Sequence, residues 1–443
     1  MRYEDIIKRG LELGLEEIEL YAQNSEGNTV KLFNGELSNY NSSITFGMSI
    51  RGLYNGKMGY VYTETVEEAA IEELLHQLIE NAKSLTSDEV EHVYPGGSKY
   101  QEVEELKADY HEHSLTEKVD LLKELSANAK AKDPRIVQVG YCQYVENSGK
   151  VRIMNSKGLD LERNSSYMAA VLGVVATNGK QTTMGFAQDI NTKFAEIEKE
   201  RLVKESSESA LGSLGAGSVE SGQYPVVFNR DVTTDLIQAF ASVFAGESAL
   251  RKVSILVDKI GEKVFGDNIN IIDDPFYKNA IIKSPFDDEG VPCYAKHVVE
   301  NGVFKGFLHS LKTAKFFNTE PTGNGFKPGV AGSITTMPTN LYLEPGKLSE
   351  DEIIATVEKG IYVTEVSGLH AGLNPISGAF NVQASGYMIE NGKKTNPITL
   401  FVISGNFYEM MNDVEHIGSN LSERFVSVAA PTIKVTKLMV SGK

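Results

Sequence analysis

Residues 30–61 have the sequence VKLFNGELSNYNSSITFGMSIRGLYNGKMGYV, and this stretch decides the fold of the first half of the chain. Two Asn-Gly pairs, Asn34-Gly35 and Asn55-Gly56, interrupt segments in which apolar and polar residues alternate. Asn-Gly between alternating segments is the strongest local signal for a β-hairpin, because a type I′ turn needs positive φ at both central residues. The stretch therefore predicts an antiparallel meander over residues 30–40 and 46–61.

Helical periodicity surrounds this meander. Apolar residues recur at helical spacing over residues 3–13 and 65–83, and Thr116 is expected to cap a helix over residues 117–132 that stops before Pro134. Further helices are predicted over residues 192–211, 231–244, 349–359 and 406–415, and further strands over residues 17–22, 136–143, 151–155 and 167–176. Helices and antiparallel strands are mixed without a βαβ rhythm, which predicts an α+β fold.

The clearest domain boundary is the Gly/Ser-rich segment LGSLGAGSVESGQYP at residues 211–225, which follows a charged helix. It predicts an N-terminal domain over residues 1–215, with an antiparallel sheet and long helices. It also predicts a mainly antiparallel β domain with a few helices over residues 222–443. No repeat of fixed period is found in the sequence.

The composition sets outer limits on function. The chain has 443 residues, 41% of them hydrophobic, and a net charge of −17, so direct binding to nucleic acid is disfavoured. No apolar run is long enough to span a membrane, and the N-terminus has no continuous apolar core, so a cytoplasmic protein is expected. Cys142 and Cys293 are far apart and are expected to be buried free thiols.

Several short motifs follow one another in the second half of the chain. They are KIGEKV at 259–264, DDP at 273–275, TGN at 322–324, NLYLEPG at 340–346, VTEVSGLH at 363–370, SGNF at 404–407 and APTIKV at 430–435. In this order and spacing they resemble the TldD/PmbA family, the family of modulators of DNA gyrase and of TldD/TldE metalloproteases. The resemblance covers nearly the whole chain.

The resemblance also implies where a catalytic site would lie. The catalytic branch of that family carries His-Glu-x-x-x-His on a helix and a zinc-binding Cys near the C-terminus. In this chain the corresponding residues are Ile237, Gln238 and Ser242, and Ile417 for the Cys. An alkyl group cannot bind zinc, an amide is no general base, and a hydroxyl is a poor zinc ligand. The resemblance therefore implies the PmbA/TldE-like branch, with no catalytic residues, metal or cofactor of its own.

A second candidate site lies in the turn-rich segment that contains His370, Gly372 and Asn374. Glycines allow close backbone approach, as in a groove that admits an extended peptide, so these residues are candidates for substrate binding. A loop histidine whose hydrogen bonds the backbone satisfies remains the alternative.

Other polar residues are expected to have structural roles. The sequence Asp287-Asp288-Glu289-Gly290 lacks EF-hand periodicity and predicts a solvated turn. Cys293 lies four residues before His297, too far for contact on a strand, and is expected to be a small buried hydrophobic residue.

The family resemblance implies a non-catalytic subunit that acts with a TldD-type zinc-bearing partner in the proteolysis of small or unfolded peptides. The partner chain would form a heterodimer with this one, and a homodimer remains possible. Two alternatives stay open at this point: an independent hydrolase with an unrecognised site, and a binding protein that regulates another assembly such as DNA gyrase.

Overall fold

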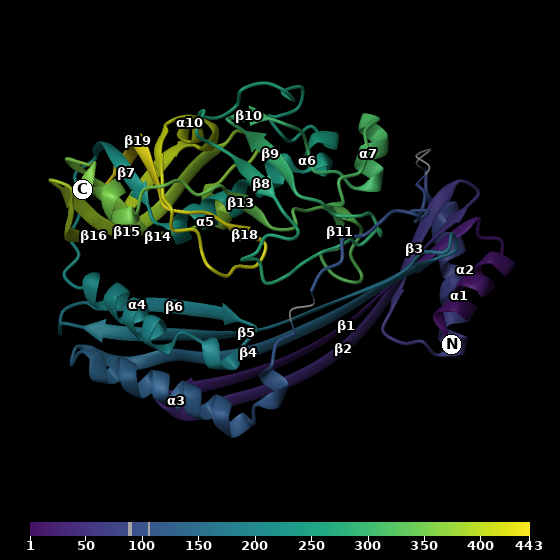
Figure 1. Ribbon diagram of the computed structural model, residues 1–443, viewed down its shortest axis with the longest axis horizontal. Helices are drawn as coiled ribbons and strands as arrows, with labels where there is room; N and C mark the ends of the chain where they lie inside the picture. The colour runs from purple at the N-terminus through teal and green to yellow at the C-terminus, as the bar shows by residue number, and fades with distance from the viewer. Residues whose placement is uncertain (87–90, 105–106) are drawn as a thin grey trace.

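The computed structural model describes residues 1–86, 91–104 and 107–443, and it has the predicted α+β fold (Figure 1). A long twisted antiparallel sheet with its helices forms the first half of the chain. The second half forms a β-rich body that lies along this sheet. None of the helices within the described ranges is long and apolar enough to cross a membrane.

The N-terminal sheet contains two units with the same element order. Its strand order is β3-β2-β1-β4-β5-β6, and every neighbouring pair is antiparallel. The strands are β1 Glu17–Phe33, β2 Glu36–Tyr54, β3 Lys57–Thr63, β4 Ile136–Asn155, β5 Asp160–Thr177 and β6 Thr182–Asn191. The helices are α1 Tyr3–Glu12, α2 Glu68–Ser84, α3 Leu115–Lys132 and α4 Lys199–Gly212. The first unit (α1, β1–β3, α2) and the second unit (α3, β4–β6, α4) are therefore both αβββα and meet at β1 and β4.

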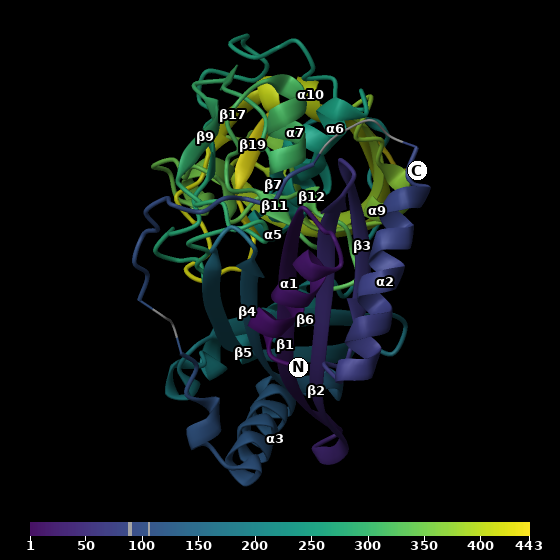
Figure 2. The same cartoon turned by 90° about the vertical axis from the view of Figure 1, so that its right-hand side faces the viewer.

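Each unit has its own hydrophobic core. In the first unit, Ile71, Leu75 and Leu78 of α2 pack with Ile18 and other buried residues of β1 and β2. In the second unit, residues of α3 and α4 pack on β4 and β5, and the far end of β1 joins the same core. Figure 2 shows α1 and α2 flanking the strands of the first unit, with α3 at the other end of the sheet.

The two predicted hairpin turns are confirmed. Asn34 and Asn55 have φ of 53° and 49°, and the glycines that follow them also have positive φ, as a type I′ turn requires. The predicted strands over residues 136–143 and 151–155 are parts of one continuous strand, β4.

The start of α3 differs from the prediction. Ser114, not Thr116, is the N-cap, and it forms a capping box with Glu117: the Ser114 side chain accepts a hydrogen bond from Glu117 N at 3.3 Å. The Ser-x-x-Glu spacing is the usual sequence signature of this cap.

The C-terminal half is built on a sheet that closes on itself. Its strand order is β16-β15-β14-β7-β19-β17, and a further pairing between β16 and β19 completes the ring. Its strands are β7 Gly222–Phe228, β14 Lys359–Ser367, β15 Ala379–Glu390, β16 Lys393–Asn406, β17 Val414–Ile417 and β19 Ile433–Ser441. A closed sheet hides the strand edges that an open sheet exposes.

A smaller sheet of order β10-β9-β8-β13-β18 and a two-stranded ribbon complete this half. These strands are β8 Ile271–Asp273, β9 Lys296–Glu300, β10 Val303–Phe304, β11 Gly325–Phe326, β12 Thr335–Thr336, β13 Leu341–Leu343 and β18 Val428–Ala429. The helices are α5 Arg230–Phe240, α6 Gly246–Leu250, α7 Leu311–Phe317, α8 Glu350–Ala355, α9 Leu369–Gly372 and α10 Phe407–Asn412. One large apolar core joins α5 to both sheets.

Three predicted helices are shorter than their patterns suggest. The helix predicted over residues 192–211 begins only at Lys199, because residues 194–196 form a 3₁₀ turn. The helix predicted over residues 349–359 ends at Ala355, because strand β14 begins at Lys359. The helix predicted over residues 406–415 ends at Asn412, because β17 begins at Val414.

Candidate functional site

Helix α5 lies where the family resemblance places the zinc-binding helix. Asn229 caps it by accepting a hydrogen bond from Val232 N at 2.8 Å. After Phe240 the chain tightens into a 3₁₀ turn over Ala241–Phe244. Positions 237 and 242 therefore do not share one continuous α-helix.

The four residues at the expected ligand positions do not form a polar site. Ile237 is 1% exposed and Ile417 is 8% exposed, and both belong to the large C-terminal core. Gln238 and Ser242 are exposed on the surface. The side chains present do not fit zinc, because the two buried ones are alkyl groups with no donor atom. Within residues 1–86, 91–104 and 107–443, no group of three or more His, Cys, Asp or Glu side chains is arranged to hold a metal ion.

The second candidate segment contains His370 in the short helix α9. Its Asn374 has a structural role, because the side-chain oxygen accepts hydrogen bonds from Ile376 N and Ser377 N at 3.0 and 3.1 Å. Gly372 packs so closely on β15 that an added Cβ would lie 2.2 Å from the carbonyl oxygen of Asn381. His370 and Asn374 are both exposed, and the oxygen of Asn374 is already used in the turn, so His370 is the exposed side chain of the three that is not part of these turn hydrogen bonds.

Cys293 is buried, as expected, and its thiol donates a hydrogen bond to the Gly323 carbonyl at 3.0 Å. Burial raises the pKa of this thiol well above its ordinary value, which disfavours the thiolate form that a nucleophile needs. His297 is exposed on β9. Cys293 is therefore the buried residue that the sequence predicts.

The expectation of a solvated turn at residues 287–290 is wrong. Asp287, Asp288 and Glu289 are 0%, 3% and 2% exposed. The turn lies between the rest of the C-terminal half and the strands of both N-terminal units. The Asp287 carboxylate accepts backbone hydrogen bonds from Glu289, Val291 and Gly325, at 2.8 to 2.9 Å.

Ion pairs connect this turn to the long sheet. Glu289 Oε1 lies 3.2 Å from Arg51 Nη1 on β2, and the Nε of the same arginine donates to Glu19 on β1 at 2.7 Å. Asp288 Oδ1 lies 2.5 Å from Arg163 Nη2 on β5. These contacts could not be predicted from the sequence, because the partners are 125 and 238 positions apart.

The burial of this cluster changes the proton affinity of its members. Burial lowers the pKa of Lys327 to about 8, and the nearby positive charge of Arg51 acts in the same direction. Burial raises the pKa of Glu289, although the charge of Arg51 opposes the shift. The Lys327 ammonium group donates to the Gly332 carbonyl at 2.7 Å.

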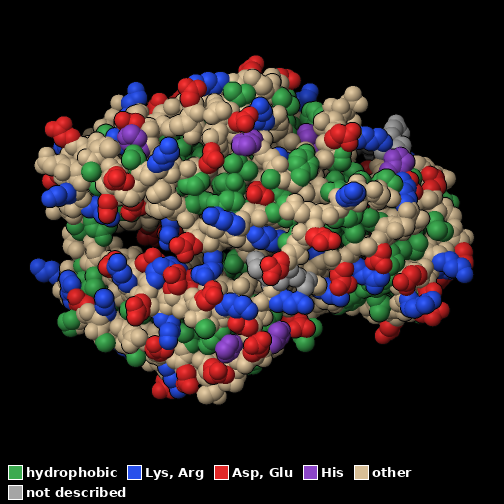
Figure 3. All heavy atoms as spheres, viewed as in Figure 1, with side chains coloured by type: hydrophobic (Ala, Val, Ile, Leu, Met, Phe, Trp, Pro, Cys, Tyr) green, Lys and Arg blue, Asp and Glu red, His purple; other side chains and the backbone are tan. Residues whose placement is uncertain are grey.

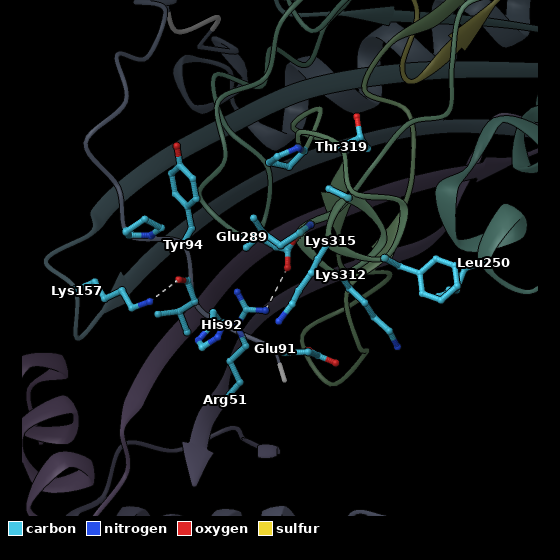
Figure 4. A pocket seen from close by; sticks show the side chains of 16 residues that line it. Arg51, Glu91, His92, Tyr94, Lys157, Leu250, Glu289, Lys312, Lys315 and Thr319 are labelled. Atoms are coloured by element: carbon cyan, nitrogen blue, oxygen red, sulfur yellow. Dashed lines mark hydrogen bonds and ion pairs between the residues drawn. The ribbon is translucent and has the colours of Figure 1, made fainter. Parts of the chain in front are cut away.

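A cavity of about 520 Å³ opens beside this cluster, between the first unit, the segment after residue 91 and helix α7 (Figure 4). Its apolar lining consists of Val93, Tyr94, Pro95, Leu250, Leu311, Ala314, Phe316 and Pro321. Its polar lining consists of Arg51, Glu91, His92, Lys157, Glu289, Lys312, Lys315 and Thr319. The volume is in the range of about 300–1,000 Å³ that is typical of small-molecule sites.

Residues from the family-like motifs have structural roles in the C-terminal half. Asp273 is 0% exposed and accepts hydrogen bonds from Thr339 N at 2.7 Å and Asn324 Nδ2 at 2.8 Å, and Lys296 Nζ lies 3.0 Å away. Asn324, which is 0% exposed, is therefore part of a buried hydrogen-bond network with Asp273.

The fold thus defines a three-part α+β protein: two αβββα units followed by a β-rich C-terminal domain. Three sequence profiles match in the same order: PmbA/TldA metallopeptidase domain 1 over residues 18–82, the central domain over residues 109–214 and the C-terminal domain over residues 221–442. The chain belongs to the PmbA/TldD metallopeptidase family.

Solved structures and related proteins support the same family assignment. A Thermotoga maritima protein named for modulation of a DNA gyrase is 31% identical, with 99% of this chain and 100% of that chain covered and a TM-score of 0.91. TldE from Thermococcus kodakarensis is 25% identical, covers 99% of both chains and has a TM-score of 0.89. A protein of Methanothermobacter thermautotrophicus named metalloprotease is 27% identical over 97% of this chain and 96% of its own length.

Proposed function

We propose that this chain is the non-catalytic, PmbA/TldE-like subunit of a two-subunit metallopeptidase that cleaves small or unfolded peptides. A TldD-type partner chain would supply the zinc site, and this chain would complete the peptide-binding surface.

The observation that carries the proposal is the set of residues at the expected ligand positions. Ile237 and Ile417 are buried in an apolar core, and Gln238 replaces the general base. Zinc in peptidases is held by imidazole, carboxylate or thiolate groups, with an acidic residue to activate the attacking water. Binding zinc at these positions would require several simultaneous substitutions.

An open strand edge supports a role in holding peptide. Strand β3 pairs with β2 only over residues 48–54, and residues 36–45 of β2 are all exposed. The pairing of β16 with β19 closes the C-terminal sheet, so this sheet has less unpaired strand edge to which a peptide could add. An extended peptide could add to the open part of β2 through main-chain hydrogen bonds.

Mixed surface charge fits a peptide ligand better than nucleic acid. Figure 3 shows acidic and basic side chains interspersed over the face that it draws, and the whole chain has a net charge of −17. Nucleic-acid binding depends on basic surface that neutralises phosphates.

Co-expression with a TldD-type chain from the same genome tests the subunit role. We expect a complex of one chain each by light scattering, and cleavage of an unfolded peptide only when both chains are present. Peptide cleavage by this chain alone, abolished by a chelator, would refute the proposal. A homodimer that does not bind the TldD-type chain would also refute it.

Two proline variants test strand addition. Successive backbone N–H groups on a strand point to opposite sides, so one of Asn41→Pro and Ser42→Pro removes a hydrogen bond to β1 and the other removes an N–H that faces outward. We expect the outward-facing variant to keep the wild-type Tm and partner binding while peptide cleavage by the complex falls. If that variant cleaves peptide at the wild-type rate, the peptide does not add to this edge.

A further inference from the structure

We propose that the outer edge of strand β6 binds an extended peptide that carries apolar side chains at alternate positions. The class of ligand rests on the proposed function, but the site lies within one chain and can be tested without a partner. This edge is distinct from the open part of β2, and its exposed side chains would select which peptides bind.

Strand β6 is the outer strand of the second unit, and its main-chain groups alternate in direction. It pairs with β5 over its whole length without a register shift. The turn between the two strands is closed by a hydrogen bond from Asn178 N to Gln181 O at 3.2 Å, so the even-numbered residues of β6 point their N–H and C=O groups away from β5. Gln188 confirms this direction, because its carbonyl accepts a hydrogen bond from Arg201 at 3.1 Å.

The even-numbered residues Met184 and Phe186 have free main-chain groups. In the described parts of the chain, no group outside the sheet forms a hydrogen bond with their N–H or C=O. Lysine, proline and bulges commonly protect an open edge, and the β6 sequence TTMGFAQDIN has none of them. Such an edge is a template to which another extended chain can add.

The side chains of the same two residues form an apolar surface on the sheet face opposite α4. Met184 and Phe186 are 50% and 54% exposed, and the Phe186 ring lies 6.3 Å from the Tyr141 ring of β4 between centroids. Gly173 of β5 makes room for this ring, because an added Cβ would lie 2.5 Å from Phe186. In an antiparallel addition, the peptide residues opposite Met184 and Phe186 would place their side chains on this face.

The size of the apolar surface favours a peptide over a folded subunit. Its three partly exposed side chains offer on the order of 300 Å², because a large aromatic side chain buries about 150–250 Å². A stable interface between folded proteins takes about 800 Å² from each partner. Figure 1 shows β6 as the strand of the second unit nearest to the C-terminal half, and Figure 3 shows the surface hollowed between these two parts. A single extended segment needs only this edge.

Fluorescence anisotropy on the isolated chain tests the side-chain pattern and the main-chain contacts. We expect labelled Thr-Val-Thr-Val-Thr to bind about tenfold more tightly than Val-Val-Thr-Thr-Thr, because both valines of the first peptide reach the apolar surface. N-methylation of its first valine should weaken binding about tenfold, since that N–H faces β6, whereas N-methylation of the central threonine should not. Equal binding of the two sequences, equal losses from the two methylations, or no binding by any probe would overturn the proposal.

Variants locate the site on β6. Phe186→Thr keeps a residue that favours strands but removes the ring, so we expect the affinity for Thr-Val-Thr-Val-Thr to fall about tenfold. Met184→Lys places a charge on the edge and should have the same effect, which keeps the test valid if Phe186→Thr does not fold. Tyr62→Thr is the matched control, because Tyr62 is 54% exposed on β3, the outer strand of the first unit. Unchanged binding in a folded β6 variant, or an equal loss in Tyr62→Thr, would overturn the proposal.

Light scattering separates a peptide site from a subunit interface. We expect the wild type and Phe186→Thr to have the same molar mass. A wild-type dimer that becomes a monomer in Phe186→Thr would show that β6 pairs with a second copy of the chain, and the proposal would fall. Because the readout is peptide binding by one chain, this site can fail while a complex with a TldD-type partner still cleaves peptide, and the reverse.

Discussion

The two αβββα units share one element order, but the surroundings of their long second strands, β2 and β5, differ. In the first unit, residues 36–45 of β2 are exposed beyond the end of β3. In the second unit, the part of β5 that β6 does not cover lies against the C-terminal half. There Arg163 donates to the Phe286 carbonyl at 3.0 Å and pairs with Asp288. One face of this strand segment thus contacts the C-terminal half in the second unit, whereas residues 36–45 of β2 are exposed on both faces in the first.

This difference shows how a duplicated arrangement can acquire two roles. The covered strand fixes the C-terminal half on the sheet through buried charges, while the open strand keeps an edge on which another chain can add. Stability should therefore depend strongly on β5 contacts and weakly on the exposed part of β2.

The largest effect is expected at Arg163. Replacing it with alanine leaves Asp288 buried without its partner, which should lower the free energy of unfolding by about 3–5 kcal/mol. Ile44→Ala on the open edge, where the side chain is 78% exposed, should change it by about 0.5 kcal/mol or less. Chemical denaturation of both variants measures the loss in the free energy of unfolding for each. Similar losses in the two variants would contradict the expected difference.

A smaller loss of stability is expected at a helix–strand contact that the two units share. Gly59 on β3 and Gly185 on β6 each lie under the helix that follows: an added Cβ would lie 2.3 Å from Leu78 O of α2 and 2.3 Å from Ser206 O of α4. Alanine at either position should therefore destabilise the protein by about 3 kcal/mol, through the same overpacking.

Gly329→Ala is the control for these variants, because its added Cβ would have no neighbour within 4 Å. Thermal denaturation of the three variants checks the expectation. A large loss for one unit and none for the other would show that the units do not share this helix–strand contact.

The sequence predicted the local features of the fold. Asn34-Gly35 and Asn55-Gly56 identified the two hairpins, because the conformation of a type I′ turn depends on those residues alone. The sequence did not predict the symmetry of the two units. Their loop lengths differ, and the symmetry appears only in the strand order.

The candidate site was predictable only in part. The assignment of Ile237, Gln238, Ser242 and Ile417 to the ligand positions came from the family resemblance, and it remains a prediction. The burial of residues 287–290 could not be predicted, because three charged residues in a turn are normally solvated. Their partners on β2 and β5 are far away in sequence, and only the tertiary fold brings them together.

A pH-dependent effect of about 2 kcal/mol is expected at His309. The side chain is 6% exposed, and burial lowers its pKa from 6.5 to about 4. The folded state therefore favours the neutral ring, so this contribution to stability is complete above pH 6.5 and is lost progressively as the pH falls from 6.5 to about 4. At pH 5 the ring is protonated in the unfolded state only, which costs about 2 kcal/mol relative to pH 8.

Urea denaturation at pH 8 and pH 5 measures this effect. His309→Gln should lose less stability than the wild type between the two values, by about 2 kcal/mol. His76→Gln, which changes an exposed histidine of the first unit, should follow the wild type. An equal pH dependence in His309→Gln and the wild type would show that His309 is not the titrating group.

The zinc content of the purified protein shows whether this chain supplies zinc ligands. We expect close to zero zinc per chain when this protein is purified alone under mild conditions, and about one zinc per complex when it is purified with a TldD-type partner. Elemental analysis by mass spectrometry, before and after dialysis against a chelator, gives both values. About one zinc per chain in the isolated protein, removed by the chelator, would contradict the claim that this chain supplies no zinc ligands.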